Sequence, residues 1–161
     1  MSTIAERAWL PYLHARPTAQ VIRFAPPPDA VSAETSMAAR EPNLFPLHEQ
    51  LNRIGLLQRN WDGYGSARPD QTAIESTRQL IEGAYRSIAP LIGWQNPHAS
   101  ASEDGEIVLE WSHGIKRLTI YVGPHQSTYV KSWGPHLVNE MEDGPLPDDW
   151  VVSLWAWLFV G

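Results

Sequence analysis

The hydrophobic period of the central part of this chain, 44–141, changes near Pro97, and this change restricts the fold more than any other feature. From 44 to Pro97 the apolar residues recur at helical spacing, and after Pro97 they alternate with a period of two. A helical period indicates amphipathic helices, and a period of two indicates strands with one buried face. Helices followed by strands predict an α+β fold, in which a small sheet carries helices on one face.

Two helices are expected before the change of period. The first covers 44–54, and its apolar stripe consists of Leu44, Leu47, Leu51 and Ile54. Gly55 and the Trp-Asp-Gly sequence that follows should end it. The second covers 71–88, with Asp70 as its N-cap and Pro90 as its stop. Its apolar side consists of Ile74, Ile81, Tyr85 and Ile88.

The strands are expected to form an antiparallel meander of three to four strands. The candidate segments are 102–111, 116–122, 127–133 and 136–141. In the first, Ile107, Leu109 and Trp111 share one face. In the second, Leu118, Ile120 and Val122 do the same. Turn sequences with glycine or proline separate the segments, which favours hairpins over crossovers.

The two ends of the chain differ from this central part. Residues 1–43 form a proline-rich arm and linker, and 44–161 form a single domain, because the composition of 25–43 is too poor in apolar residues to form a core. Within the arm, 18–25 is a candidate strand and 8–13 is an apolar segment. At the other end, 150–160 is strongly apolar, and Asp148 is its expected N-cap. Eleven residues are too few to span a bilayer, so this run is either a buried helix or an exposed docking element.

Charge and cysteine content exclude several classes of function. The formal net charge is −6, with only two lysines, which opposes binding to phosphate backbones and favours a basic partner. The absence of cysteine excludes disulfides, thiolate metal sites and a cysteine nucleophile. No secretory signal is recognisable at the N-terminus, so the sequence predicts a cytoplasmic protein.

The stretch RNWDGYGSARP, residues 59–69, is the strongest local motif. Gly63 and Gly65 allow positive φ, and Asp62 can accept hydrogen bonds from amides two residues ahead. The stretch therefore suits a tight corner between the two helices, with Trp61 as an anchor. It also suits a recognition loop with Trp61 and Tyr64 as rigid contacts. The interface candidates in the whole chain are Trp9, Trp61, Asp62, Tyr64 and Trp133.

Acidic residues offer a second kind of site. Asp62, Asp104, Glu106 and Glu110 are the candidates for a carboxylate site around a divalent metal. Carboxylates that point outward from a half-buried strand are also what any solvent-facing side of a sheet usually carries, with no site implied. The six histidines lack the spacing of metal ligands, and there is no phosphate-binding glycine loop. No catalytic residue, cofactor or metal is assigned.

Two motifs on either side of the second helix resemble a widespread group of small uncharacterised bacterial proteins. They are NWDGYGSARP, 60–69, and DGEIVLEW, 104–111, followed by RLTIYV, 117–122. The group's pattern is Trp-Asp-Gly-x-Gly-Ala-x-Pro, a helix, and then Asp-Gly-x-Ile-x-Leu-Glu-Trp, and the likeness covers about 44–133. Ser66 and Ala67 depart slightly from it. The resemblance implies a bacterial or phage-related accessory protein of the cytosol and transfers no activity.

These features favour a non-enzymatic protein-binding protein, such as an adaptor, an immunity protein or an antitoxin-like inhibitor. A small, acidic, Trp-rich chain with an N-terminal arm suits that role, because the arm can add a strand or an apolar segment to a partner. One alternative is a metal-dependent hydrolase or nuclease using the acidic residues near the sequence WDGYG, 61–65. Another is a structural homo-oligomer that pairs through exposed tryptophans.

Overall fold

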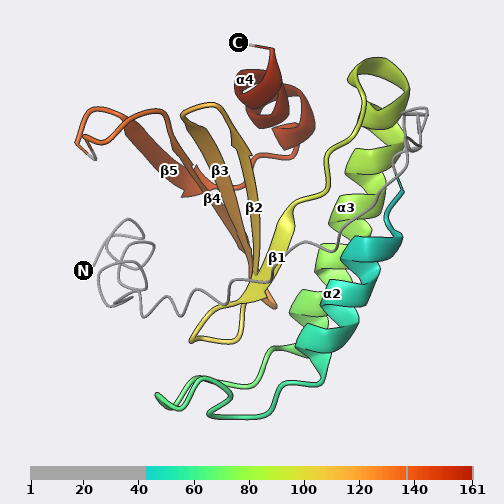
Figure 1. The fold of residues 1–161 in the computed structure, drawn as a ribbon, viewed down its shortest axis with the longest axis vertical. Coiled ribbons are helices and arrows are strands. Elements are labelled where there is room, and N and C mark those ends of the chain that lie inside the picture. The colour runs from blue at the N-terminus through green and yellow to red at the C-terminus, as the bar shows by residue number, and fades with distance from the viewer. Residues whose placement is uncertain (1–42, 137, 161) are drawn as a thin grey trace, which may run out of the picture. The chain divides into compact units, whose positions relative to one another are not determined.

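Within the part of the chain that the structure describes, two helices precede a five-stranded antiparallel sheet, and a short helical segment follows it (Figure 1). The computed structural model describes residues 43–136 and 138–160. The helices before the sheet are α2 (Phe45–Gly55) and α3 (Gln71–Ile92). The strands are β1 (His98–Ala101), β2 (Ile107–His113), β3 (Lys116–Val122), β4 (Ser127–Ser132) and β5 (Met141–Pro145). The α+β class is confirmed, with five strands where three to four were expected.

Helix α2 buries the stripe that its spacing predicted. Leu47, Leu51 and Ile54 are buried, and Leu44 packs beside them. The helix ends at Gly55, as predicted, and Leu56 is its C-cap residue. These leucines lie three or four residues apart, so they share one face of the helix and pack against α3 and the sheet.

Helix α3 begins as the sequence predicted and ends later. Asp70 caps it, because its Oδ1 accepts hydrogen bonds from the amides of Thr72 at 2.7 Å and Ala73 at 3.0 Å. Pro90 was expected to stop the helix, and this expectation was wrong. The helix runs through Pro90 to Ile92 and ends at Gly93, whose φ is 77°. Proline removes one backbone donor, and a bond lost in the last turn costs less than one in the middle of a helix.

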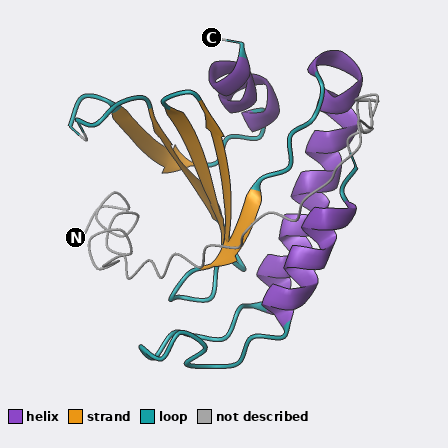
Figure 2. Ribbon diagram, viewed as in Figure 1, coloured by secondary structure: helices purple, strands orange, loops and turns teal. Residues whose placement is uncertain are grey.

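The strands follow one another in spatial order, β1-β2-β3-β4-β5, with every neighbour antiparallel (Figure 2). The predicted alternation in β2 and β3 is confirmed. Ile107, Leu109, Trp111, Leu118, Ile120 and Val122 are all buried in the core. Register explains why they share one face, because Leu109 lies opposite Ile120 and Trp111 lies opposite Leu118. Helix α3 contacts both strands on this face.

Two strands differ from the expectation. Strand β1 was not predicted, since His-Ala-Ser-Ala has no large alternating apolar residue. Its position depends on pairing with β2 and on a hydrogen bond from the Ala99 amide to Gln50 Oε1 of α2, at 3.0 Å. The strand expected at 136–141 was misplaced. Glu140 closes a turn by accepting from the His136 amide at 2.8 Å, and β5 starts at Met141.

The apolar run near the C-terminus packs into the core, but not as the helix that was expected. It forms a π-helical turn, η1 (Val151–Trp155), followed by α4 (Ala156–Phe159). Asp148 is not its N-cap; the residue before η1 is Trp150, without a side-chain cap. The inward residues are Leu154, Trp155 and Leu158. Among the described residues, no helix combines the length and apolar character needed to cross a bilayer.

Four tryptophans unite this C-terminal segment with the sheet. Trp94 and Trp155 stack with ring centroids 5.1 Å apart, and Trp111 meets both rings edge-on. Trp150 packs on Trp111 at 6.1 Å. Such aromatic pairs add to the free energy of burial, so the cluster fixes the end of the chain against β2. Among the tryptophans that the structure describes, Trp94, Trp111, Trp150 and Trp155 thus belong to the buried core.

Candidate functional site

The α2–α3 connection, residues 56–70, is held in a single tight shape by its own backbone. The Asn60 amide donates to the Ser66 carbonyl at 2.8 Å, which closes the loop at its base. Asn60 Oδ1 accepts from the Gly65 amide at 2.7 Å. Asn60, Gly63 and Gly65 all have positive φ, a region that glycine enters without cost and asparagine tolerates. We call residues 60–66 the WDGYG loop.

Asp62 is the centre of this loop. Its Oδ1 accepts from the Tyr64 amide at 2.9 Å and from the Ser66 amide at 3.4 Å, and its Oδ2 accepts from the Ser66 hydroxyl. This is the Asx turn that the sequence suggested. Hydrogen bonds to the carboxylate hold the pKa of Asp62 below its ordinary value of 3.8. The bond from the Ser66 hydroxyl has the largest effect, and the bond from the Tyr64 amide has the next largest. The carboxylate is thus used to shape the loop.

This arrangement predicts that the loop loosens in acid. Since the pKa of Asp62 is lowered in the fold, its hydrogen bonds contribute stability above pH 3.8, and that contribution is lost as the pH falls through the folded value. The protection of the Tyr64 and Ser66 amide protons, measured against their intrinsic exchange rates at the same pH, should then fall. Asp62→Ala should lose the same protection at neutral pH. NMR of these two amides checks both results, and unchanged exchange in Asp62→Ala would contradict them.

Trp61 and Tyr64 take different positions on the loop. The Trp61 ring nitrogen donates to the Ala67 carbonyl at 3.2 Å, so this side chain ties the loop to its own base, and 38% of it remains exposed. Tyr64 is 94% exposed. Leu56, at the start of the connection, is 75% exposed and was not singled out from the sequence, because it directly follows a helical stripe. The connection thus presents two exposed apolar side chains and one that is partly covered.

The turn before β2 supports the base of this connection. The Ala67 amide donates to the Glu103 carbonyl at 2.7 Å, and the Asp70 amide donates to the Gly105 carbonyl at 2.9 Å. Gly105 has φ 85°, and a Cβ there would lie 2.6 Å from the Arg68 carbonyl oxygen. The two sequence motifs therefore join through their backbones. Sequence spacing gave no signal for this joint, because 35 or more residues separate its two halves.

The other acidic candidates lie on or beside β2. Asp104 is in the turn before the strand, and the Glu106 amide donates to Ser102 Oγ at 3.1 Å. Glu110 alternates with the buried residues of β2 and lies opposite His98 and Thr119, on the face away from the core. In the described part of the chain, no three acidic, histidine or cysteine side chains come together as a metal site requires. The carboxylate site stays a prediction.

Trp133 does not join the WDGYG loop in one patch. It follows β4, and Ser132 pairs with Arg117, which pairs with Ser112 near the end of β2. The turn at Gly105 is at the beginning of β2, so Trp133 belongs to the opposite end of the sheet. There it meets Trp157 edge-on at 6.1 Å. Trp9, another interface candidate, lies outside the described residues.

Trp157 lies against both lysines of the chain. The ammonium groups of Lys116 and Lys131 are 5.3 and 5.5 Å from the Trp157 ring centroid. These are cation–π distances. Lys116 also donates to the Trp157 carbonyl at 2.8 Å. This end of the sheet is therefore stabilised by internal contacts.

A small polar triad links β4 and β5. The Tyr129 hydroxyl donates to Glu142 Oε1 at 2.7 Å, and Lys131 Nζ lies 3.0 Å from Glu142 Oε2. The surroundings of Tyr129 raise its pKa from 10.0 to about 12. The largest cause is the hydrogen bond to Glu142, followed by burial and by the negative charges of Glu142 and Asp143. The neutral phenol therefore stabilises the fold below pH 10, and this contribution is lost as the pH rises through about 12.

Removing the acceptor should lower this pKa. In Glu142→Ala, which removes both the acceptor oxygen and its charge, we expect the pKa of Tyr129 to return most of the way to 10.0, because the largest cause is gone. Asp143→Asn removes a charge without removing the hydrogen bond, and should lower it less. Ultraviolet titration of the phenol, with Tyr129→Phe to assign the signal, measures both shifts. Equal shifts in the two variants would contradict the assigned cause.

The comparisons with known proteins give no relative. No family model, curated protein or solved structure matches this chain. The resemblance of its two motifs to a bacterial protein group therefore stays a prediction.

Proposed function

We propose that this chain is a non-enzymatic protein-binding accessory protein, of the adaptor, immunity or antitoxin-like inhibitor kind, and that the WDGYG loop is its recognition element. One observation supports this most. Tyr64 is 94% exposed at the tip of a loop whose backbone is closed by hydrogen bonds at Asn60, Asp62 and Ser66. An internal anchor would be buried, and a solvated corner has no need of an aromatic ring.

The physical basis is pre-organisation. Binding normally costs free energy because side chains and loops lose freedom, and a loop already held in place loses little. Tyrosine has few rotatable bonds and presents both an apolar ring and a hydroxyl, which is why it is common among the residues that dominate interfaces. Trp61 lies three positions before Tyr64, partly exposed, and would extend the contact.

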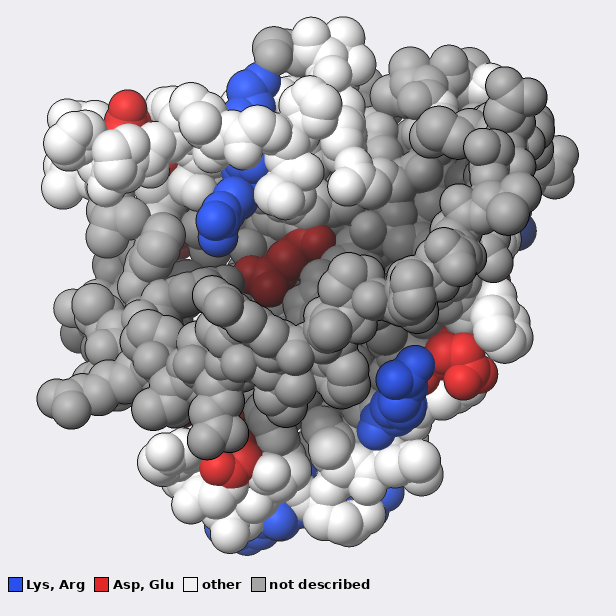
Figure 3. All heavy atoms as spheres, in the orientation of Figure 1, with Lys and Arg blue, Asp and Glu red and all other residues white. Residues whose placement is uncertain are grey.

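Charge supports a basic partner surface. The whole chain carries a formal net charge of −6, which would speed encounter with a basic protein. On the face shown in Figure 3, the acidic and basic side chains of the described residues are interspersed. The apolar loop would then provide most of the affinity, and the overall charge would act mainly on the association rate.

A site-specific crosslink tests this function. A photoreactive phenylalanine analogue at position 64 of the full chain should crosslink to a second protein in lysate of the source cell. The same analogue at Phe45, which is 71% exposed on α2, is the matched control and should not. Crosslinking from both positions alike, or from neither, would contradict the proposal. Crosslinking of the chain only to itself would favour the homo-oligomer, which light scattering would then verify.

A further inference from the structure

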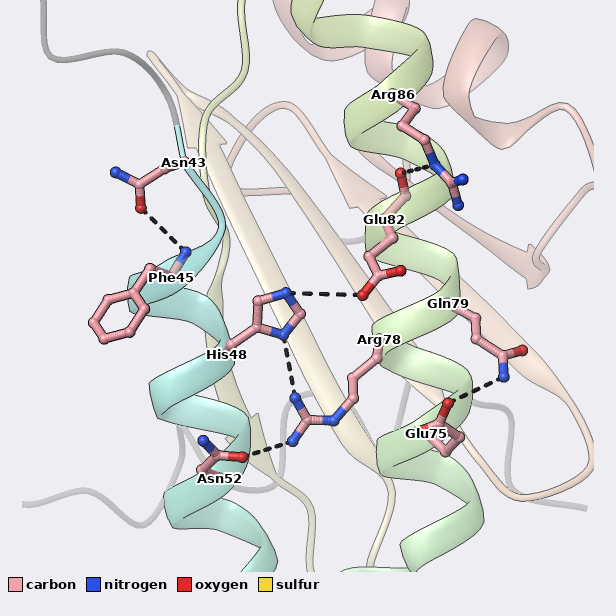
Figure 4. A network of polar contacts seen from close by, with 9 residues as sticks. All are labelled: Asn43, Phe45, His48, Asn52, Glu75, Arg78, Gln79, Glu82 and Arg86. Carbon is pink, nitrogen blue, oxygen red and sulfur yellow. Dashed lines mark hydrogen bonds and ion pairs between the residues drawn. The ribbon is translucent and has the colours of Figure 1, made fainter.

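A histidine joins helices α2 and α3 on their outer side. His48 Nδ1 lies 3.1 Å from Arg78 NH1, and its Nε2 lies 3.9 Å from Glu82 Oε1. Arg78 also donates from NH2 to Asn52 Oδ1 at 2.8 Å. Figure 4 shows the guanidinium of Arg78 reaching from α3 to both His48 and Asn52 (Figure 4).

The chemistry of the guanidinium decides where the imidazole proton lies. Arginine has only donors and stays charged in proteins, so the nitrogen that meets Arg78 must accept. For this contact to be a hydrogen bond, His48 Nδ1 must present its lone pair, which puts the single proton of the neutral ring on Nε2. When the ring gains a second proton, Nδ1 becomes a donor as well. The contact with Arg78 then changes from a hydrogen bond into a repulsion between like charges.

The protonated ring has another partner within reach. Nε2 faces the Glu82 carboxylate at 3.9 Å, which is too long for a hydrogen bond and short enough for an ion pair. Arg78 and Glu82 lie four residues apart, one turn along the same face of α3. Asn52, on α2 itself, carries no charge. Gln50 makes the contact with β1. It lies two positions after His48, which places it on the opposite side of α2.

We propose that His48 is a pH-dependent latch between α2 and α3. In its neutral form it accepts from Arg78, and in its protonated form it exchanges this partner for Glu82, one turn further along α3. Arg78 then holds α2 through Asn52 only. The latch lies on the side of α2 away from β1 and is independent of the proposed binding function.

Two double-mutant cycles in the full chain test the exchange of partners. The first combines His48→Ala with Arg78→Ala, and the second combines His48→Ala with Glu82→Ala. At pH 8 the 48–78 coupling should change the folding equilibrium constant by roughly two- to tenfold, as ordinary hydrogen bonds do, and at pH 5 it should vanish or reverse. The 48–82 coupling should be near zero at pH 8 and reach roughly two- to fivefold at pH 5.

A matched variant separates titration from loss of an acceptor. His48→Asn places an amide oxygen near the Nδ1 position, so its coupling to Arg78 should be the same at both pH values. Nitrogen NMR of the ring should show Nδ1 without a proton at pH 8. The proposal is overturned if the 48–78 coupling does not depend on pH, if both couplings change in the same direction, or if Nδ1 carries the proton.

Discussion

Gly105→Ala is expected to destabilise the fold by about 2–4 kcal/mol. Part of this cost is backbone strain, because Gly105 has φ 85°, and this region costs other residues about 1–2 kcal/mol. The rest comes from the Arg68 carbonyl oxygen, which would lie 2.6 Å from the new Cβ and belongs to the backbone. Moving it would disturb the bonds at Ala67 and Asp70, each worth about 1 kcal/mol.

Gly114→Ala is the matched control for this prediction. Gly114 also has a positive φ, 60°, but a Cβ there meets nothing within 4 Å. Its substitution should therefore cost only the strain, about 1–2 kcal/mol. Denaturant unfolding of the two variants measures the difference, provided that the dependence on denaturant is unchanged. If both variants lose the same stability, the backbone contacts between the WDGYG loop and the turn at Gly105 do not contribute the stability assigned to them.

The sequence specified the elements with strong periodicity and missed those defined by contact. Strands β2 and β3 were predictable because Ile107, Leu109 and Leu118 alternate with polar residues. Strand β1 was not, since its small residues are ordered by β2 and by Gln50. At the C-terminus, all-round apolar character indicated burial but could not distinguish a π-helical turn from an α-helix.

The candidate site was predictable to a similar degree. Asp62 and the glycines specified the turn, because their preferences act over a few residues. The backbone joint at Gly105 depends on residues far apart in the chain, so no local preference encodes it. The exposure of Tyr64, against the partial burial of Trp61, is likewise a tertiary property. The partner of His48 depends in the same way on which turn of α3 packs beside α2.

Tyr64→Ala should reduce affinity for the protein partner by roughly 30- to 1000-fold, the range of an interface residue worth about 2–4 kcal/mol. Its effect on stability should stay within about 0.5 kcal/mol, because the side chain is 94% exposed and makes no core contact. Most of the loss should appear as faster dissociation, since the overall charge that steers association is unchanged.

The direct measurement is the dissociation constant of the complex with the protein that crosslinks at position 64. It should be determined for the unaltered chain, for Tyr64→Ala, and for Phe45→Ala as the exposed aromatic control. The proposed function predicts a weakening of roughly 30-fold or more for Tyr64→Ala and less than about threefold for Phe45→Ala. Equal affinities for all three folded proteins would contradict a recognition role for the WDGYG loop.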